Sequence, residues 1–580
     1  MCGILGARSL SGPLTLRLAR ETLDTMQHRG PDGEGWWEDP TTQLGFRRLA
    51  IIDLAGGRQP LVNEDGRVLL TLNGEIYNHH ALRAELAAEH RFSTGSDAEV
   101  VLHGYEAWGE AVFSRLRGMF AAAIVDLRRD RVVLARDRVG KKPLYFTVRG
   151  HAVYWASELR PLMSLGRPPI DREALNDYLR FGYVPAPRTL LSGVYKLPAG
   201  GMLRLEGGRV AATRWAPRFG VGPRSDGADP DPEAWGEQVR EALGEAVSTR
   251  LESEVPLGFL LSGGVDSASV FALGAAALNR KAMAFTIGFD DVELDERDAA
   301  GEVARRYAAD HRVRVLREDE AGDLGAVVAR CEEPLATDAL LPTDRVFAAV
   351  RAEGITTVLA GEGSDEIFAG YTKFLAAIRM DHDAWMRSGR GPLARYLATE
   401  EFCFPQLAQR RALLGEVATD EGYAELEGEV AHLDPLSQML AFEVALRLPD
   451  RINHRLDRLS MAHAIEARAP FMDPAVIDLA LALPHALRHR QGQGKWILRS
   501  AMKEHLPQRV THAKKAPFRA PDTWFVAGLT AARVRQAGLV RPEAFEALTL
   551  AARYVASARE GLYNLAVLHL WHERWYCALA

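Results

Sequence analysis

The second residue of the chain is a cysteine, in a Met-Cys-Gly-Ile opening at residues 1–4. Methionine is commonly trimmed before a small residue, and its removal would give Cys2 a free α-amine. An α-amine titrates near ~7.7–8.0 and a free thiol near ~8.5, so the amine can accept the thiol proton at neutral pH. Cys2 is therefore a candidate nucleophile that carries its own base. The alternative is a small residue near a chain end.

A second candidate site is the turn Ser-Gly-Gly-Val-Asp-Ser at residues 262–267, between a strand-like segment at 257–261 and a helical pattern at 268–277. Backbone N–H groups at such a helix start suit a phosphate, and Asp266 can hold Mg²⁺. The Walker A spacing Gly-x4-Gly-Lys-Ser/Thr is absent. The turn predicts a pyrophosphate site, although a turn that binds nothing remains an alternative.

A third segment, Gly-Glu-Gly-Ser-Asp-Glu at 361–366, follows another predicted strand. Ligands of doubly wound sheets gather at the carboxyl ends of their strands, so Asp365 is the natural second Mg²⁺ ligand. Lys495 lies in the glycine-rich segment 492–496 and, taken alone, is typical of a solvated surface lysine.

The elements around these segments change character along the chain. Up to residue 214, short apolar runs alternate with turn signals, as at 68–72, 119–125, 132–135, 202–205 and 209–213, which predicts a sheet-rich half. Residues 216–232 shift to Pro, Gly, Asp and Arg and read as a linker. An amphipathic stretch at 233–251 follows.

Beyond that stretch, predicted strands at 257–261, 284–287, 313–316 and 355–359 alternate with helices. This alternation predicts a parallel sheet covered by helices. Residues 370–580 show a nearly continuous helical pattern and are expected to pack onto that sheet.

The bulk composition narrows the class of protein. A chain of 580 residues is too long for one core, and a formal net charge of -6 with scattered basic residues argues against nucleic-acid binding. Hydrophobic residues make up 47%, with no apolar run near the ~18 residues of a membrane span, so a soluble protein acting on small molecules is expected. Four cysteines without metal-type spacing, and no secretory leader, favour the cytoplasm.

Four segments together carry a resemblance: residues 1–4, His-Arg-Gly-Pro-Asp-Gly at 28–33, Leu-Asn-Gly-Glu-Ile-Tyr-Asn at 72–78, and Thr-Gly-Ser-Asp at 94–97. They resemble the N-terminal-nucleophile glutaminase domains of asparagine synthetase, glutamine phosphoribosyl-pyrophosphate amidotransferase and glucosamine-6-phosphate synthase. With the turns at 262–267 and 361–366, and with segments 457–463 and 466–471 in the same order, the chain is similar to the glutamine-hydrolysing (B-type) asparagine synthetase family.

This resemblance implies an α/β architecture in two domains. Residues 1–215 would form a class II glutamine amidotransferase domain with an αββα sandwich, residues 216–232 a linker, and residues 233–580 an ATP-pyrophosphatase-type domain with a doubly wound parallel sheet. The implied reaction releases ammonia from glutamine and channels it through an apolar tunnel to a carboxylate adenylated with ATP and Mg²⁺. The products are the amide, glutamate, AMP and pyrophosphate.

The resemblance also implies roles for residues of the first half. Cys2 would be the nucleophile, with the Asn73 side chain and the Gly74 N–H forming the oxyanion hole. Arg48 would hold the glutamine carboxylate, while Asp97 and Glu75 would hold its ammonium or amide. The glutamine-binding residues would be Arg48, Leu49, Ala50, Ile51, Ile52, Asn73, Gly74, Glu75 and Asp97. For Arg48 or Asp97 alone, a surface salt bridge is the alternative, and His28 is expected to structure its loop.

In the second half, the resemblance makes Asp266 and Asp365 the metal ligands and points Lys495 at the phosphates. Glu362 would contact the acceptor acid or deprotonate the ammonia. The ATP-binding residues would be Leu260, Ser262, Gly263, Gly264, Asp266, Ser267, Ile287, Ala360 and Gly361. His454, His463 and the arginines between 447 and 458 are expected to be structural.

The chain departs from the family pattern at three places. Family members usually carry Ser at the position of Ala360, commonly Asp-Glu-Pro at 332–334 where this chain has Glu-Glu-Pro, and often Lys-x-Gly-Phe near 514–518. No departure removes the nucleophile or a metal ligand. The acceptor is therefore expected to be L-aspartate or, alternatively, another carboxylic acid of secondary metabolism or cell-envelope biosynthesis.

The sequence also disfavours two other functional classes. Relatives that close β-lactam rings typically lack the N-terminal cysteine, so Cys2 argues against that branch. A pseudoenzyme that senses nucleotide is disfavoured because Cys2, Asp266, Asp365 and Lys495 are all intact. The sequence leaves the oligomeric state open, with a homodimer as one candidate.

Overall fold

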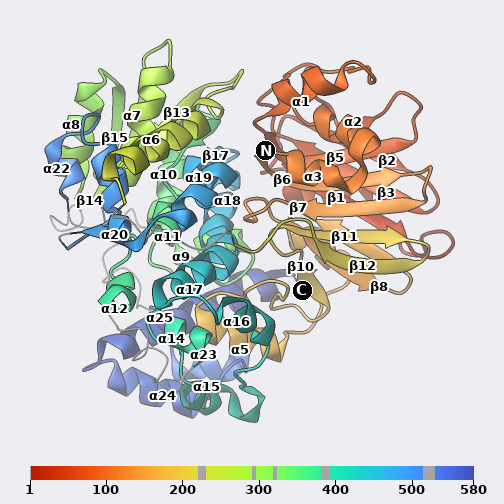
Figure 1. The fold of residues 1–580 in the computed structure, drawn as a ribbon. Coiled ribbons are helices and arrows are strands. Elements are labelled where there is room, and N and C mark those ends of the chain that lie inside the picture. Colours follow the sequence, from red (N-terminus) through yellow and green to blue (C-terminus); the bar gives the residue numbers. More distant parts are fainter. Residues whose placement is uncertain are drawn as a thin grey trace.

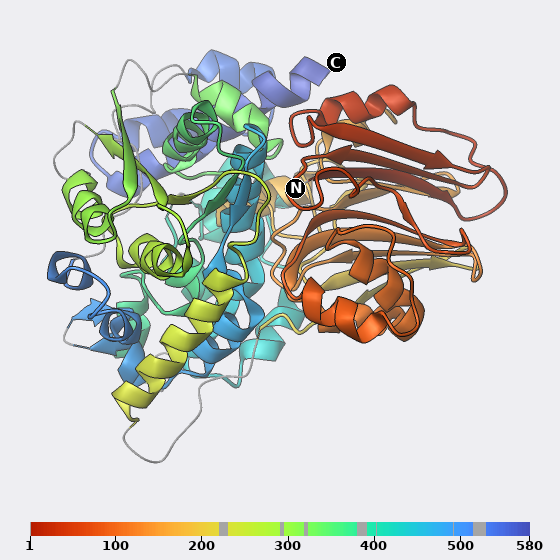
Figure 2. The ribbon, with the colours of Figure 1, turned by 90° about the horizontal axis from the view of Figure 1, so that it is seen from above.

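The computed structural model describes residues 2–219, 230–289, 295–317, 323–379, 391–401, 403–490, 492–513 and 529–579. Met1 and the family departure at 514–518 lie outside the described residues. A sheet-rich N-terminal half packs beside a larger, helix-rich half (Figure 1). The N-terminus lies on the side of the first half that faces the second (Figure 2).

Two six-stranded antiparallel sheets form the first half. In spatial order, one sheet contains β10 (Val194–Lys196), β8 (Tyr145–Arg149), β9 (Ala152–Ala156), β1 (Cys2–Ser9), β3 (Thr42–Arg48) and β2 (Gly33–Glu38). The other contains β12 (Arg209–Arg214), β11 (Gly201–Glu206), β7 (Arg131–Arg136), β6 (Gly118–Asp126), β5 (Val68–Ile76) and β4 (Leu61–Val62).

The strand β6 shows why the sheets stack as a sandwich. Ala121, Ala123 and Val125 pack into the core between the two sheets. The alternating residues Phe120, Ala122 and Ile124 pack into a second core beneath the helices. Because successive strand residues point to opposite faces, β6 is buried along its whole length and its small residues let both layers approach.

Helices cover both outer faces, which gives the predicted αββα sandwich. The helical segments on these faces are η1 (Arg20–Met26), α1 (His79–Leu86), α2 (Glu99–Trp108), η2 (Gly109–Ala111), α3 (Val112–Arg115) and α4 (Arg160–Met163). The last helix before the linker, α5 (Arg172–Phe181), packs instead against helical residues 407–417 of the second half. The predicted strands at 68–72, 119–125, 132–135, 202–205 and 209–213 are confirmed as β5, β6, β7, β11 and β12.

A five-stranded parallel sheet lies at the centre of the second half, in the order β15 (Asp310–Leu316), β14 (Met283–Phe289), β13 (Leu257–Leu260), β16 (Thr357–Leu359) and β17 (Glu466–Arg468). The chain leaves β13 toward β14 on one side and reaches β16 on the other. The boundary between β13 and β16 is therefore the topological switch point, where such sheets bind ligands. The predicted doubly wound parallel sheet is confirmed.

Helices surround this sheet. Before and around it run α6 (Pro232–Ser248), α7 (Val265–Ala277), α8 (Arg297–Arg306), α9 (Leu324–Cys331), α10 (Leu340–Ala352) and α11 (Ser364–Ile367). Further along are α12 (Phe374–Arg379), α14 (Pro392–Leu397), α15 (Leu407–Leu414), η4 (Gly415–Val417), α16 (Ala424–Val430), α17 (Pro435–Phe442), η5 (Glu443–Ile452) and α18 (Asn453–Met461). The last part contains η6 (Pro470–Met472), α19 (Pro474–Ala482), α20 (His485–Arg488), the hairpin β18 (His489–Arg490) and β19 (Gln493–Gly494), α21 (Trp496–Ala501), α22 (Gln508–Thr511), α23 (Ala531–Ala537), α24 (Pro542–Ala551), α25 (Ala556–Trp571), η8 (His572–Tyr576) and η9 (Cys577–Leu579).

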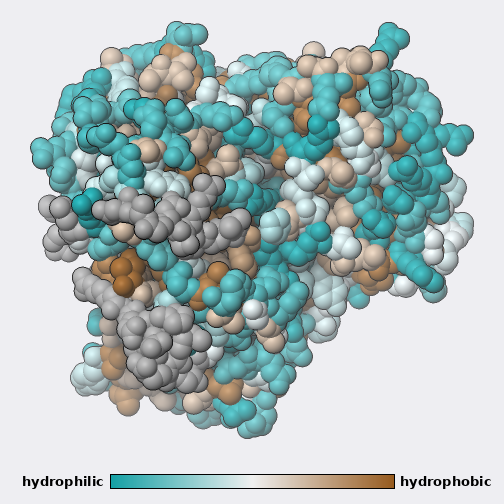
Figure 3. All heavy atoms as spheres, viewed as in Figure 1, coloured by the Kyte–Doolittle hydropathy of each residue, from teal (hydrophilic) through white to brown (hydrophobic). Residues whose placement is uncertain are grey.

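The expectation of an almost purely helical region after residue 370 is wrong at β17, which pairs with β16 and completes the sheet. Its sequence, Glu-Ala-Arg, lacks the apolar run of a buried strand, because Glu466 and Arg468 are buried as an ion pair with 2.6 Å between Oε1 and Nε. The molecular face in Figure 3 is mainly hydrophilic, with separated hydrophobic patches. Within the described ranges, no helix has the length and apolarity to cross a membrane.

Candidate functional site

Cys2 is the first residue of β1 and pairs with Arg48 of β3. Its side chain is buried in the core between the sheets. Burial raises the pKa of the Cys2 thiol, so a neighbouring base is needed to form the thiolate. The backbone nitrogen of Cys2 donates to Asn73 Oδ1 over 3.0 Å, which fixes the atom that would become the α-amine.

Asn73 and Gly74 lie side by side on β5, next to Cys2. Asn73 Nδ2 is 3.5 Å from Ser157 Oγ, and that oxygen also accepts the Ile4 N–H over 3.0 Å. A Cβ atom at Gly74 would lie 2.0 Å from the Met119 carbonyl oxygen, so only glycine fits between β5 and β6. The structure thus brings together the two groups predicted to form an oxyanion hole.

The segment predicted to bind glutamine forms a loop after β3. The Arg48 guanidinium donates to the carbonyls of Ile52, Asp53 and Leu54 at 3.3, 2.5 and 2.9 Å. Arg48 therefore holds its own loop, and a ligand carboxylate would have to compete with these carbonyls. Leu49 and Ile51 are buried in an apolar cluster, whereas Ala50 donates its N–H to Asp32 at 2.9 Å.

The two carboxylates of the predicted glutamine site, Asp97 and Glu75, are both buried. Asp97 Oδ2 accepts the Ile76 N–H over 2.7 Å, and burial raises the pKa of Asp97. Burial and the nearby Glu466 and Asp97 raise the pKa of Glu75 well above its usual range, although Arg468 lies 3.4 Å from it. Asp97 is thus tied to the backbone of the first half, while Glu75 faces a guanidinium from β17.

Arg29 connects the nucleophile to the second half of the molecule. Its Nε donates to the Cys2 carbonyl oxygen over 3.1 Å, and its two terminal nitrogens donate to the Asp457 carboxylate of α18 at 2.8 and 3.1 Å. Glu158 accepts a further bond from Arg29 at 3.0 Å. Arg29 is fully buried, so it depends on these acceptors to balance its charge.

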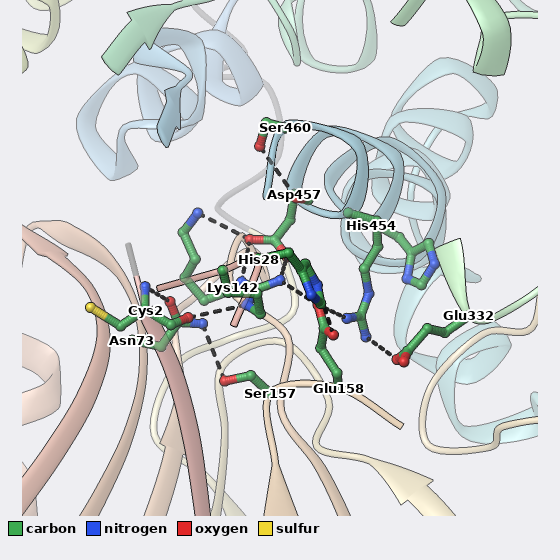
Figure 4. Close-up of polar contacts among 12 residues, drawn as sticks. Cys2, His28, Asn73, Lys142, Ser157, Glu158, Glu332, His454, Asp457 and Ser460 are labelled. Atoms are coloured by element: carbon green, nitrogen blue, oxygen red, sulfur yellow. Dashed lines mark hydrogen bonds and ion pairs between the residues drawn. The ribbon is translucent and has the colours of Figure 1, made fainter. Parts of the chain in front are cut away.

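The surrounding charges form one buried network (Figure 4). Lys142 lies 3.3 Å from Asp457, and Arg458 lies 2.7 Å from Glu158. Burial opposes ionisation of Asp457, but Arg29 and Lys142 outweigh it and lower its pKa to about 2. His28 contacts Glu158 at 3.1 Å, in keeping with the expected loop-structuring role.

Sequence reasoning assigned no role to Arg29, Lys142, Glu158 or Asp457. Asp457 and Arg29 both fall in segments that carry the family resemblance, which was the available signal. Arg29 and Asp457 are 428 positions apart, so no local spacing pattern predicts that they pair.

At the second site, the predicted turn lies between β13 and α7. Ser267 Oγ accepts the Ser262 N–H and contacts Ser262 Oγ, both at 2.9 Å. Ser262 Oγ also accepts the Gly264 N–H over 3.2 Å. A Cβ at Gly361, just after β16, would lie 2.6 Å from the Ser267 backbone nitrogen. Glycine therefore lets the two motifs meet at the switch point.

Asp266 and Asp365 face one another across the Lys495 ammonium. Lys495 Nζ lies 2.5 Å from a carboxylate oxygen of each aspartate, and the lysine is only 2% exposed. The alternative of a solvated surface lysine is therefore wrong. Ser364 Oγ donates to Asp266 over 2.7 Å and orients it. Two carboxylates around one cationic position form a donor set that suits Mg²⁺.

The remaining residues predicted for this site surround the same strand ends. Leu260 ends β13, Ile287 lies on β14, and Ala360 follows β16 with its N–H bonded to the Arg468 carbonyl at 2.8 Å. Glu362 Oε1 accepts a hydrogen bond from Arg455 over 2.8 Å. Arg455 and Asp457 are both on α18, so one helix contacts Glu362 at one site and Arg29 at the other.

The two histidines predicted to be structural are consistent with that role. His454 is buried and contacts the Cys331 carbonyl at 2.9 Å, and His463 contacts Asp344 at 2.9 Å.

Comparison with known proteins gives matches over most of the chain. Residues 238–573 match the family model for asparagine synthase, and residues 1–216 match that for a glutamine amidotransferase domain. The chain is 31% identical to glutamine-hydrolysing asparagine synthetase 1 of Bacillus subtilis, over 90% of this chain and 87% of that protein. It is 32% identical to a putative glutamine-hydrolysing asparagine synthetase of Mycobacterium tuberculosis, over 91% and 89% of the two chains. Amidase chry2 of Gibberella zeae is 29% identical, over 87% and 85%.

Proposed function

The chain belongs to the asparagine synthase family, and from this we propose that it hydrolyses glutamine at Cys2 and uses the ammonia, with ATP, to amidate a carboxylic acid. L-aspartate is the proposed acceptor, because relatives over most of the chain carry the name asparagine synthetase. A different acid is the second candidate, favoured by Ala360 and by the similarity to a protein named as an amidase.

In the first half, Cys2 Sγ would attack the glutamine amide carbon after passing its proton to the α-amine freed by loss of Met1. Because burial raises the thiol pKa, this internal base is essential to the proposal. Asn73 and Gly74 would donate hydrogen bonds to the developing oxyanion. The protonated α-amine then gives its proton to the amide nitrogen, so ammonia leaves as the thioester forms, and water releases glutamate from Cys2.

The ammonia would cross an apolar contact between the two halves. Leu49, Ile51 and Met119 of the first half pack against Met461 and Ala464 of the second in one cluster. Apolar walls offer ammonia no proton and exclude water. This cluster therefore supports direct transfer from Cys2 toward the switch point of the parallel sheet.

In the second half, Asp266 and Asp365 would hold Mg²⁺, which neutralises charge on the phosphates when bound. The donor set fits, because the two carboxylates already share one cationic group, the Lys495 ammonium. The N–H of Gly263 at the start of α7, and that of Gly264 in exchange for its bond to Ser262 Oγ, would bind the β- and γ-phosphates. Lys495 would offer its charge to the same phosphates.

This binding mode leaves the α-phosphorus open to the acceptor carboxylate, so the products should be AMP and pyrophosphate. Glu362, held by Arg455, is the proposed contact for the acceptor or for the attacking ammonia. The main support for this proposal is the position of Arg29. Its guanidinium contacts both the Cys2 carbonyl and Asp457 of α18, so buried contacts connect the two sites.

The test uses glutamine labelled with ¹⁵N in the amide, ATP with a labelled adenine, and L-aspartate followed by a panel of other carboxylic acids. The proposal expects AMP in equal amount to the labelled amide product. The acid that supports AMP formation identifies the acceptor. ADP as the main product would overturn the assignment of residues 262–267.

A further inference from the structure

A cluster of histidine and glutamate side chains lies on the helical face of the first half. Glu64 comes from the turn between β4 and β5, His90 follows α1, and His103 and Glu106 stand three positions apart on α2. One ligand atom from each of the four lies within 4.8 Å of the others. We propose that these four residues bind one divalent transition-metal ion of the Zn²⁺ type.

Three of the six separations among these ligand atoms are close to the edges of a tetrahedral site. His103 Nδ1 lies 3.2 Å from Glu106 Oε2 and 3.9 Å from Glu64 Oε2, and His90 Nδ1 lies 3.7 Å from Glu106 Oε2. Bonds of about 2.0–2.2 Å to nitrogen and oxygen put tetrahedral ligands roughly 3.3–3.6 Å apart. The three measured separations differ from these edges by a few tenths of an ångström at most, and the other three are no longer than 4.8 Å.

Each carboxylate has one oxygen held elsewhere and the other turned toward the imidazoles. Glu106 Oε1 accepts from Asn63 and Arg128 at 2.6 and 3.1 Å, which leaves Oε2 beside His103. Glu64 Oε1 accepts the Arg91 N–H over 2.8 Å, which leaves its Oε2 on the same side. Metal sites are typically built in this way, with the ligands oriented by further hydrogen bonds.

The buried histidine has a similar support on its far side. His103 Nε2 lies 3.5 Å from Glu99 Oε1, and that oxygen accepts the Ser93 N–H over 2.7 Å. His103 Nε2 makes no hydrogen bond in this structure, but a carboxylate in this place could accept one and so orient the ring for metal binding through Nδ1. The His103 side chain is 1% exposed and Glu64 is 42% exposed, so the cluster opens to solvent through Glu64.

The competing arrangement has a proton in place of the metal. Burial alone would lower the pKa of His103, but the carboxylates of Glu106 and Glu99 outweigh it and raise the pKa to about 9. His103 would then be a cation between carboxylates, and the cluster would be an ion-pair network. Metal binding measured directly separates the two arrangements.

The site would fasten the β4–β5 turn and the segment after α1 onto α2. β5 carries Asn73 and Gly74, and Asp97 lies just before α2. The cluster packs on the outer side of this sheet, whereas Cys2 lies in the core between the sheets. The ion would therefore be structural and would take no part in glutamine hydrolysis.

The test titrates the metal-free full-length protein with Zn²⁺ in competition with a chromogenic chelator, and with Co²⁺ to read the geometry by absorption. We expect one Zn²⁺ bound per chain at this site and the strong visible bands of tetrahedral Co²⁺. His103→Gln should weaken binding by at least about tenfold. Because His103 is buried, the half-exposed Glu64→Gln provides a second variant that is expected to fold normally.

The matched control is His80→Gln. His80 belongs to a separate group with His79 and Glu252, so its loss should leave binding at the proposed site unchanged. The proposal is overturned if wild type, Glu64→Gln and His103→Gln bind Zn²⁺ with the same stoichiometry and affinity. Loss of the Co²⁺ bands in His80→Gln with retention in Glu64→Gln would likewise refute it.

Discussion

The contact between Arg29 and Asp457 predicts that a substitution in the second half impairs hydrolysis in the first. Asp457→Asn keeps the shape of the side chain but removes its charge and one hydrogen-bond acceptor. Arg29 then keeps Glu158 as its remaining close carboxylate. Because Arg29 Nε holds the Cys2 carbonyl, the position of the nucleophile should become less well defined.

The expected loss of stability follows from the pKa of Asp457, which is about 2 against an ordinary 3.8. A difference of nearly two units corresponds to about 2 kcal/mol. Because the folded-state pKa is lowered, this contribution is complete above the unfolded-state value and is lost as the pH falls toward 2. Asp457→Asn should therefore lower the free energy of unfolding by about 2 kcal/mol at pH 7, and by progressively less below pH 4.

The expected catalytic effect is larger than the stability change alone would give. A displacement of about 1 Å in a reacting group can cost about a hundredfold in rate, so kcat/KM for glutamine hydrolysis should fall between about tenfold and a hundredfold. Ammonia-dependent synthesis should change little. Chemical denaturation and release of glutamate from glutamine provide the two measurements.

A matched control spans the same two halves. Arg138 pairs with Asp478, whose side chain is 51% exposed, so Asp478→Asn should leave hydrolysis and stability essentially unchanged. The reasoning is refuted if Asp457→Asn hydrolyses glutamine at the wild-type rate while its unfolding free energy falls as expected. In that case Arg29 would hold the two halves together without positioning Cys2.

Four other substitutions separate the two chemistries. Cys2→Ala should abolish glutamine-dependent amidation and leave ammonia-dependent synthesis intact, and failure of added ammonium to rescue the product would exclude the two-site scheme. Asp266→Asn and Asp365→Asn should each reduce ATP–pyrophosphate exchange by about a hundredfold or more while glutaminase activity persists, since each uncovers charge at the metal site; unchanged exchange in both would mean that the metal lies elsewhere. Lys495→Met should reduce ATP–pyrophosphate exchange without affecting glutamine hydrolysis, because the ammonium lies at the second site. Exchange at the wild-type rate in this variant would show that Lys495 does not act on the phosphates.

Local patterns in the sequence were enough to predict most of the framework. Strands such as β6 and β13 have continuous apolar runs, and the turn at 262–267 combines glycine with hydroxyl side chains between a strand and a helix. These features depend on neighbours within a few residues. The parallel sheet also follows from the alternation of strands and helices.

Features that depend on distant partners were not predictable in this way. Lys495 resembles a surface lysine until the fold brings it to Asp266, 229 positions away. β17 could not be separated from the predicted helical region, because Glu466 and Arg468 neutralise one another only when the fold buries them. The four residues of the proposed metal site are split between a turn, a loop and a helix, and His103 and Glu106 alone give too weak a motif.

The position of α18 has a consequence for protein engineering. The Asp457 carboxylate accepts two hydrogen bonds from Arg29 of the first half, although α18 itself is part of the second half. In a chimera that joins this glutaminase half to the synthetase half of a relative, the buried charge of Arg29 is balanced only if the relative's helix places a carboxylate where Asp457 lies. The two segments on either side of the linker are therefore not the pieces that should be exchanged between relatives. The piece to exchange is the first half together with α18, and a designer who wishes to change the acceptor acid should graft around that helix.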